Sequence, residues 1–207
     1  MAHGAIACFL GDTAEATMAF AATRPPEIPR IALVDFQNDC VGTSLEVVRT
    51  LFKRYLQLLK EGRPEEARKY KLFGVRPDTA SNLRDQSVPP LGDRALDCGV
   101  NPRLVFAMRE AIDQAFRTWG LGREDEGIAR EYCRDVKIAV TGGFNPSRIQ
   151  QFEDLKVPAD IYGVGSWLLS PATSAGPRTT SRRTWFGSRS RAAGTILRKS
   201  DAKPATI

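Results

Sequence analysis

Short apolar runs of strand length alternate with amphipathic segments of helix length between residues 31 and 166. The apolar runs predict four strands, at residues 31–34, 70–75, 136–140 and 160–162. After the first run, apolar residues recur at helical spacing from Ser44 to Leu59, and Gly62-Arg63-Pro64 predicts the end of that helix. Asn101-Pro102 and Pro146 predict the starts of two more helices. Strands joined by crossovers of about a dozen residues or more pair in parallel, so the sequence predicts an α/β fold with a parallel sheet.

Polar and glycine residues follow each predicted strand. They are Asp35, Arg76, Asp78, Thr141-Gly142-Gly143 and Gly163-Val164-Gly165-Ser166. Barrels and open parallel sheets both place ligand sites at the carboxyl ends of their strands. A complete (β/α) barrel needs about eight strands and about 250 residues. Residues 1–170 therefore predict a partial α/β barrel, and the aperiodic residues 171–207 are assigned to a separate tail.

The two glycine clusters predict adjacent loops whose backbone N–H groups face a common ligand. Gly142 and Gly143 follow one strand, and Gly163 and Gly165 follow the next. Glycine lets the backbone approach a phosphate closely, and barrels frequently hold phosphate in the loops after their last two strands. The alternative for each cluster is an ordinary glycine turn.

Three charged residues near the strand ends are candidates for ligand contacts. Arg76 suits a phosphate or carboxylate, and Asp78 suits ribose hydroxyls or a bound Mg²⁺. The alternative is a surface ion pair that closes the loop. Asp35 has the equivalent position after the preceding strand, with an Asx turn or a helix cap as its alternative. His3 is the only histidine of the chain, and composition alone gives it no role.

The excess positive charge of the chain lies in its last 37 residues. The formal net charge is +6, yet residues 171–207 hold eight Lys or Arg against Asp201 alone, and residues 1–170 are nearly neutral. The composition of this tail predicts disorder. Nucleic-acid binding through the basic tail remains the outside alternative, although its aromatic residues, Trp185 and Phe186, are too few to indicate a stacking platform.

Other classes of protein are not predicted. The cysteines, Cys8, Cys40, Cys98 and Cys133, are widely spaced, which with one histidine disfavours a zinc site and predicts free thiols in a reducing cytoplasm. No run approaches the roughly 18 apolar residues of a membrane span. The first residues lack the basic and apolar regions of a secretory signal.

Taken together, the segments at the strand ends resemble the nicotinate phosphoribosyltransferases, which are type II phosphoribosyltransferases. The matching segments are Met1-Ala2-His3-Gly4, Ala32-Leu33-Val34-Asp35, Gly74-Val75-Arg76-Pro77-Asp78-Thr79, Val140-Thr141-Gly142-Gly143-Phe144 and Tyr162-Gly163-Val164-Gly165-Ser166. They occur in the family's order over residues 1–168.

The resemblance implies an incomplete α/β barrel joined to an N-terminal α/β domain, in a cytoplasmic homodimer of the NAD biosynthesis pathway. The implied reaction joins nicotinate to 5-phosphoribosyl 1-diphosphate, with ATP as co-substrate and Mg²⁺ assisting the departing diphosphate. No protein ligands for a metal are implied. His3 matches the histidine that is transiently phosphorylated, and Asp35 the acidic residue that orients it. Arg76 and Asp78 resemble the pair that grips the phosphoribosyl group. The residues that match the 5′-phosphate loops are Gly142, Gly143, Gly163 and Gly165.

The chain departs from the family pattern at both ends. It starts inside the Met-Ala-His motif, so the preceding strand and the N-terminal domain are expected to be missing. Beyond Ser170 the sequence no longer resembles the family, and a frameshift is our hypothesis for residues 171–207. Family-like sequence in another frame of the coding DNA would support it, and its absence from both would refute it. The alternatives in function are a nicotinamide or quinolinate phosphoribosyltransferase, or an inactive truncated fragment.

Overall fold

The computed structural model describes residues 1–169 and 195–198 of the chain. One sheet contains strands β1 (Ile31–Leu33), β2 (Gly74–Arg76), β3 (Lys137–Val140), β4 (Ile161–Val164) and β5 (Thr195–Arg198). The first four are parallel and lie in the order of the chain, and β5 pairs antiparallel with β4. The predicted α/β class and parallel sheet are confirmed. β5 was not predicted, and the rest of the tail lies outside the described residues.

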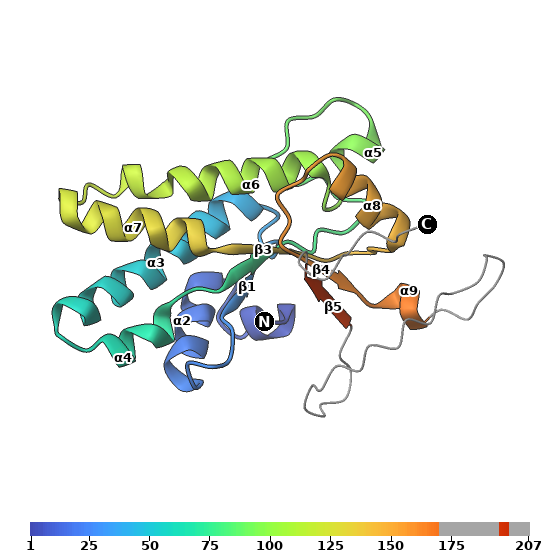
Figure 1. Cartoon of the computed structure of the whole chain (residues 1–207). Helices are drawn as coiled ribbons and strands as arrows, with labels where there is room; N and C mark the ends of the chain where they lie inside the picture. The colour runs from blue at the N-terminus through green and yellow to red at the C-terminus, as the bar shows by residue number, and fades with distance from the viewer. Residues whose placement is uncertain (170–194, 199–207) are drawn as a thin grey trace, which may run out of the picture.

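Helices precede, join and follow the strands, and most of them pack on one face of the sheet. They are α1 (His3–Ala7), α2 (Thr13–Thr23), α3 (Cys40–Lys60), α4 (Pro64–Ala67), α5 (Arg94–Asp97), α6 (Pro102–Gln114), α7 (Arg123–Asp135), α8 (Pro146–Asp154) and α9 (Ser166–Leu169), with 3₁₀ turns η1 (Arg68–Tyr70) and η2 (Ala115–Thr118). Figure 1 shows α3, α6 and α7 lying together beside the strands. Within residues 1–169, no helix has the length and apolarity to cross a membrane.

The main core joins one face of the sheet to these helices. Strand residues at alternate positions, such as Ala32, Val75 and Val140, lie in one buried cluster with Leu51 of α3 and Leu104 of α6. Because side chains alternate across a strand, this pattern assigns every second strand residue to the helical layer. A smaller cluster, in which Leu33 contacts the α1–α2 region, buries part of the opposite face.

Two helix starts were predicted correctly because their signals are local. Asn101 Oδ1 accepts a hydrogen bond from Leu104 N at 3.0 Å at the start of α6. Asn145 Oδ1 accepts one from Arg148 N at 2.9 Å at the start of α8. Each asparagine is followed by a proline at the first helical position, where no N–H is needed. By contrast, α3 begins at Cys40, earlier than predicted from Ser44.

The second predicted strand was too long. Residues 70–75 were assigned to it, whereas β2 begins at Gly74. The hydroxyl of Tyr132 donates to Tyr70 O at 2.6 Å and accepts from Leu72 N at 3.0 Å. This side chain from α7 therefore takes the backbone groups that a longer strand would have paired with its neighbours.

A buried arginine holds the connection between α2 and β1. The Arg30 side chain is 1% exposed, and burial lowers its pKa. Its guanidinium donates hydrogen bonds to four backbone carbonyls. These belong to Ala21, Arg24, Pro25 and Ile28. One side chain thus fixes the turn that leads into the first strand.

Candidate active site

The residues singled out from the sequence gather at the carboxyl ends of the parallel strands. Asp35 follows β1, Arg76 ends β2, and the 141–143 loop follows β3. Gly163 lies within β4, and Gly165 follows it. Because β1 to β4 run in the same direction, their carboxyl ends share one edge of the sheet. These residues therefore lie at or next to the strand ends, with Gly163 inside β4 and not after it as predicted, and their roles remain predictions.

His3 contacts Asp35 although 32 positions separate them in the chain. His3 Nε2 lies 3.2 Å from Asp35 Oδ2, and the two side chains are 50% and 8% exposed. The Phe36 ring lies beside the imidazole, with centroids 6.4 Å apart. Asp35 Oδ1 is buried and has no hydrogen-bond partner among the described residues. Asp35 does not cap the helix that follows it, because the N-cap of α3 is Asp39.

The histidine reaches this edge because the first residues are fixed to the ends of β1 and β2. The amino group of Met1 donates to Ile31 O at 3.0 Å. Arg76 Nη2 donates to Met1 O at 2.8 Å. Burial, with a smaller effect from the Arg76 charge, lowers the pKa of that amino group. Arg76 therefore connects the segment that carries His3 to the second strand.

Arg76, Asp78 and Thr141 form one hydrogen-bonded group. Arg76 Nη1 lies 3.2 Å from Asp78 Oδ2, and both side chains are about one quarter exposed. Thr141 Oγ1 accepts from Arg76 Nη1 at 3.3 Å and donates to Asp78 Oδ1 at 2.6 Å. The ion pair considered from the sequence is present, but it lies mostly buried within the candidate site and not on the open surface. The role of the threonine hydroxyl could not be predicted from the sequence, because a contact between strand ends leaves no local pattern.

The two glycine clusters do not have the same structural basis. Gly142 has φ +92°, a backbone conformation that favours glycine, and it lies against the backbone of Thr79. A Cβ on Gly163 would lie 2.6 Å from Thr141 Cγ2, so β4 approaches the 141–143 loop too closely for a larger residue. Gly143 also has positive φ, +75°, whereas a Cβ on Gly165 would meet open space.

Arg148 of α8 supports the first glycine loop from within the protein. Its Nη1 donates to Gly142 O at 2.6 Å, and its Nη2 donates to Val100 O at 2.7 Å. The guanidinium lies over the Phe144 ring, 4.4 Å from the centroid, and burial lowers its pKa. Arg148 was not among the residues singled out from the sequence. Its side chain holds the 141–143 loop against the start of α8.

The donor atoms at this edge fit Mg²⁺ delivered by a substrate better than a resident metal. Among the described residues, no group of three or more His, Cys, Asp or Glu side chains is placed to hold a metal ion. Mg²⁺ is commonly held by one or two carboxylates together with substrate phosphates. Asp35 has a free hard oxygen donor, Oδ1, and Asp78 offers a second carboxylate at the same edge.

The Thr141 hydroxyl should contribute to stability through its hydrogen bonds. Thr141→Val is expected to destabilise the protein by about 1 kcal/mol, because Asp78 Oδ1 and Arg76 Nη1 lose a shared partner. Urea denaturation would measure the change, with Thr141→Ser as the matched control. The serine variant should keep most of the stability. A loss in Thr141→Ser with none in Thr141→Val would show that the methyl group, packed at Gly163, matters instead.

Comparisons of the chain with protein-family models, curated proteins and solved structures found no match. A histidine–carboxylate pair, an arginine–carboxylate pair and two glycine loops meet at the carboxyl ends of the strands.

Proposed function

We propose that this chain is the catalytic barrel portion of a nicotinate phosphoribosyltransferase, which uses ATP to join nicotinate to 5-phosphoribosyl 1-diphosphate. The observation that carries the proposal is the His3–Asp35 contact, at the same sheet edge as Arg76 and Asp78. A carboxylate that accepts a hydrogen bond from one imidazole nitrogen fixes the tautomer of the ring and balances the positive charge that develops when the other nitrogen reacts.

The architecture supports the barrel part of the proposal. Four parallel strands lie in chain order, with the helices that join them in one layer against a common core. Doubly wound sheets instead reverse their strand order at a switch point. Sequential order is the order of strands in a (β/α) barrel, and four strands would make about half of one.

The geometry at His3 suits phosphoryl transfer from ATP. Asp35 Oδ2 accepts the hydrogen bond from Nε2–H, which leaves the Nδ1 lone pair as the nucleophile. Nδ1 would attack the γ-phosphorus, forming the N–P bond while the bond to the ADP oxygen breaks and ADP leaves with the electron pair. Asp35 would balance the positive charge that develops on the imidazole ring.

The remaining strand ends would hold the phosphoribosyl substrate. Arg76 offers a guanidinium to a phosphate, and Asp78 offers carboxylate oxygens to the ribose hydroxyls. The Gly142 and Gly163 loops would let backbone N–H groups approach the 5′-phosphate. Mg²⁺, held by the diphosphate with Asp35 or Asp78, would neutralise charge on the leaving group.

Binding of 5-phosphoribosyl 1-diphosphate tests the substrate class directly. Calorimetry in the presence of Mg²⁺ is expected to show that Arg76→Ala weakens binding about tenfold or more, because a charge-assisted contact to phosphate is lost. Arg94→Ala, which removes an exposed arginine of α5, is the matched control and should bind as the wild type does. Equal binding by the two variants, or no binding by the wild type, would contradict the proposal.

Turnover with ATP and each of the three pyridines would then separate the alternatives. Nicotinate mononucleotide as the product supports the proposal, whereas product from nicotinamide or quinolinate identifies the other enzymes of this class. Binding of the phosphoribosyl substrate with no turnover would support the inactive-fragment alternative. Nucleic-acid binding by the basic tail, the partners and the cellular location remain predictions from the sequence.

A further inference from the structure

A hollow with an apolar floor lies along α3, away from the strand ends. Its volume is about 300 Å³, within the range of small-molecule sites. It is lined by Arg49, Phe52, Lys53, Leu56, Gln57 and Lys60 of α3 and by Trp119 and Leu121 of the segment before α7. Arg49 lies about 14 Å along the helix from Cys40, where α3 leaves the candidate active site. The two sites are therefore separate.

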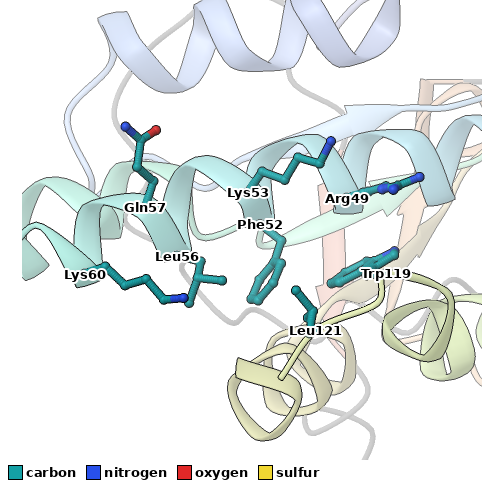
Figure 2. A pocket seen from close by; sticks show the side chains of 8 residues that line it. All are labelled: Arg49, Phe52, Lys53, Leu56, Gln57, Lys60, Trp119 and Leu121. Atoms are coloured by element: carbon teal, nitrogen blue, oxygen red, sulfur yellow. The ribbon is translucent and has the colours of Figure 1, made fainter. Parts of the chain in front are cut away.

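The floor of the hollow is already formed by packed rings. Phe52 is 1% exposed, and Trp119 stacks on it with centroids 4.9 Å apart and an interplanar angle of 28°. Tyr132 supports Phe52 from the other side by an edge contact at 5.2 Å. Figure 2 shows Phe52, Leu56, Trp119 and Leu121 gathered around one space. A flat apolar group could pack there without rearrangement of the core.

Positive charge surrounds this floor. Helix α3 contains four cationic side chains and one carboxylate, Glu46. Lys60 is neutralised by Asp125, with Nζ 2.6 Å from Oδ2. Within the part of the chain that the structure describes, Arg49 and Lys53 have no hydrogen-bond or ion-pair partner. They are four positions apart on one helix face, an arrangement in which like charges destabilise a helix.

A second hollow beside the first leaves room around these two cations. It has a volume of about 460 Å³ and shares Arg49, Lys53 and Trp119 with the first. The two cations therefore stand between two accessible spaces. An anion bound to them from the first hollow would relieve their mutual repulsion, whereas the carboxylate of Glu46 lines the second hollow and disfavours an anion there.

We propose that this region is a binding site for a small aromatic anion, a carboxylate or a phosphate ester. The ring would lie against Trp119, Leu56 and Leu121, and the anionic group would bind between Arg49 and Lys53. The guanidinium of an arginine matches the planar geometry of a carboxylate and of a phosphate, whereas an ammonium adds charge without that geometry. The proposal is independent of any activity at the strand ends.

Calorimetry with nitroaromatic probes of matched shape tests the charge requirement. 4-Nitrobenzoate and 4-nitrophenyl phosphate are expected to bind the full chain, and neutral 4-nitrobenzamide should bind about tenfold more weakly. Which of the two anions binds more tightly distinguishes a carboxylate site from a phosphate site. Failure of both anions to bind, or equal affinity for the amide, would overturn the proposal.

Two variants test whether the nitroaromatic probe binds at this site. Arg49→Ala/Lys53→Ala should reduce affinity for the anions about tenfold or more, with Arg24→Ala as an exposed matched control. The double variant removes like-charge repulsion, so its melting temperature should not fall. Trp119→Phe should keep the affinity but lose the quenching of tryptophan fluorescence by the probe. Unchanged affinity in the double variant, or unchanged quenching in Trp119→Phe, would refute this location.

Discussion

Replacement of His3 by alanine is expected to abolish transfer of the γ-phosphate of ATP to the protein. The imidazole supplies the nucleophilic nitrogen, and among the described residues no other histidine exists to replace it. Wild-type protein incubated with γ-labelled ATP should gain label in a form that survives base and is lost in acid, as an N–P bond requires. Label retained by His3→Ala under the same treatment would contradict the assignment.

Asp35→Asn tests the other half of the pair. The asparagine oxygen can still accept a hydrogen bond from Nε2, but it carries no charge to balance the imidazolium. In a serine protease, the same substitution at the aspartate that contacts the catalytic histidine lowers the reaction rate by roughly 10⁴-fold. We therefore expect the rate of γ-phosphate transfer from ATP to His3 to fall by several orders of magnitude in Asp35→Asn. Asp39→Asn, which alters the cap of α3, is the control for general damage to this region.

Replacement of Arg30 by methionine is expected to cause the largest loss of stability of any single substitution considered. Four backbone carbonyls lose a charged donor at once, and the carbonyl of Ala21 lies in a buried region where water cannot replace it. Each buried unsatisfied acceptor costs about 1–3 kcal/mol, and removal of the buried charge offsets part of the total. A net loss of about 3 kcal/mol follows, which lowers the melting temperature by roughly 10 °C in a chain of this size.

Arg24→Met is the matched control for this prediction. Arg24 is an exposed arginine of the same turn, and only its backbone carbonyl contacts Arg30. Thermal and urea denaturation should give a stability close to that of the wild type. If the two variants are equally stable, the hydrogen bonds of the Arg30 guanidinium add nothing beyond what water supplies.

Most of the fold was predictable because its signals are local. Buried strands appear in the sequence as short apolar runs. The Asn-Pro pairs at 101–102 and 145–146 indicate where two helices start. The second strand was predicted to start at residue 70 because the sequence does not show that the Tyr132 hydroxyl, about 60 positions away, binds the backbone of Tyr70 and Leu72. Helix α7 was not predicted either, although its few buried residues, Ala129, Tyr132 and Cys133, lie at helical spacing.

The candidate site was predictable as a place but not as a set of contacts. Parallel strands bring their ends to one edge, so Asp35, Arg76 and Gly142 could be grouped from the sequence. The pairing of His3 with Asp35 followed only from a family resemblance. The contacts of Thr141 and Arg148 join separate strand and helix ends, and nothing in residue spacing indicates which polar groups will meet there.

The strand order also has a consequence for how the chain folds. Paired residues of β3 and β4 are 22 positions apart in the chain, whereas those of β2 and β3 are 63 apart. Closing the shorter loop costs about 1 kcal/mol less conformational entropy. The β3–α8–β4 unit is therefore the cheapest part of the sheet to nucleate. Both glycine loops belong to this unit, so the candidate phosphate-binding loops would form before the segment that carries His3 packs against the ends of β1 and β2.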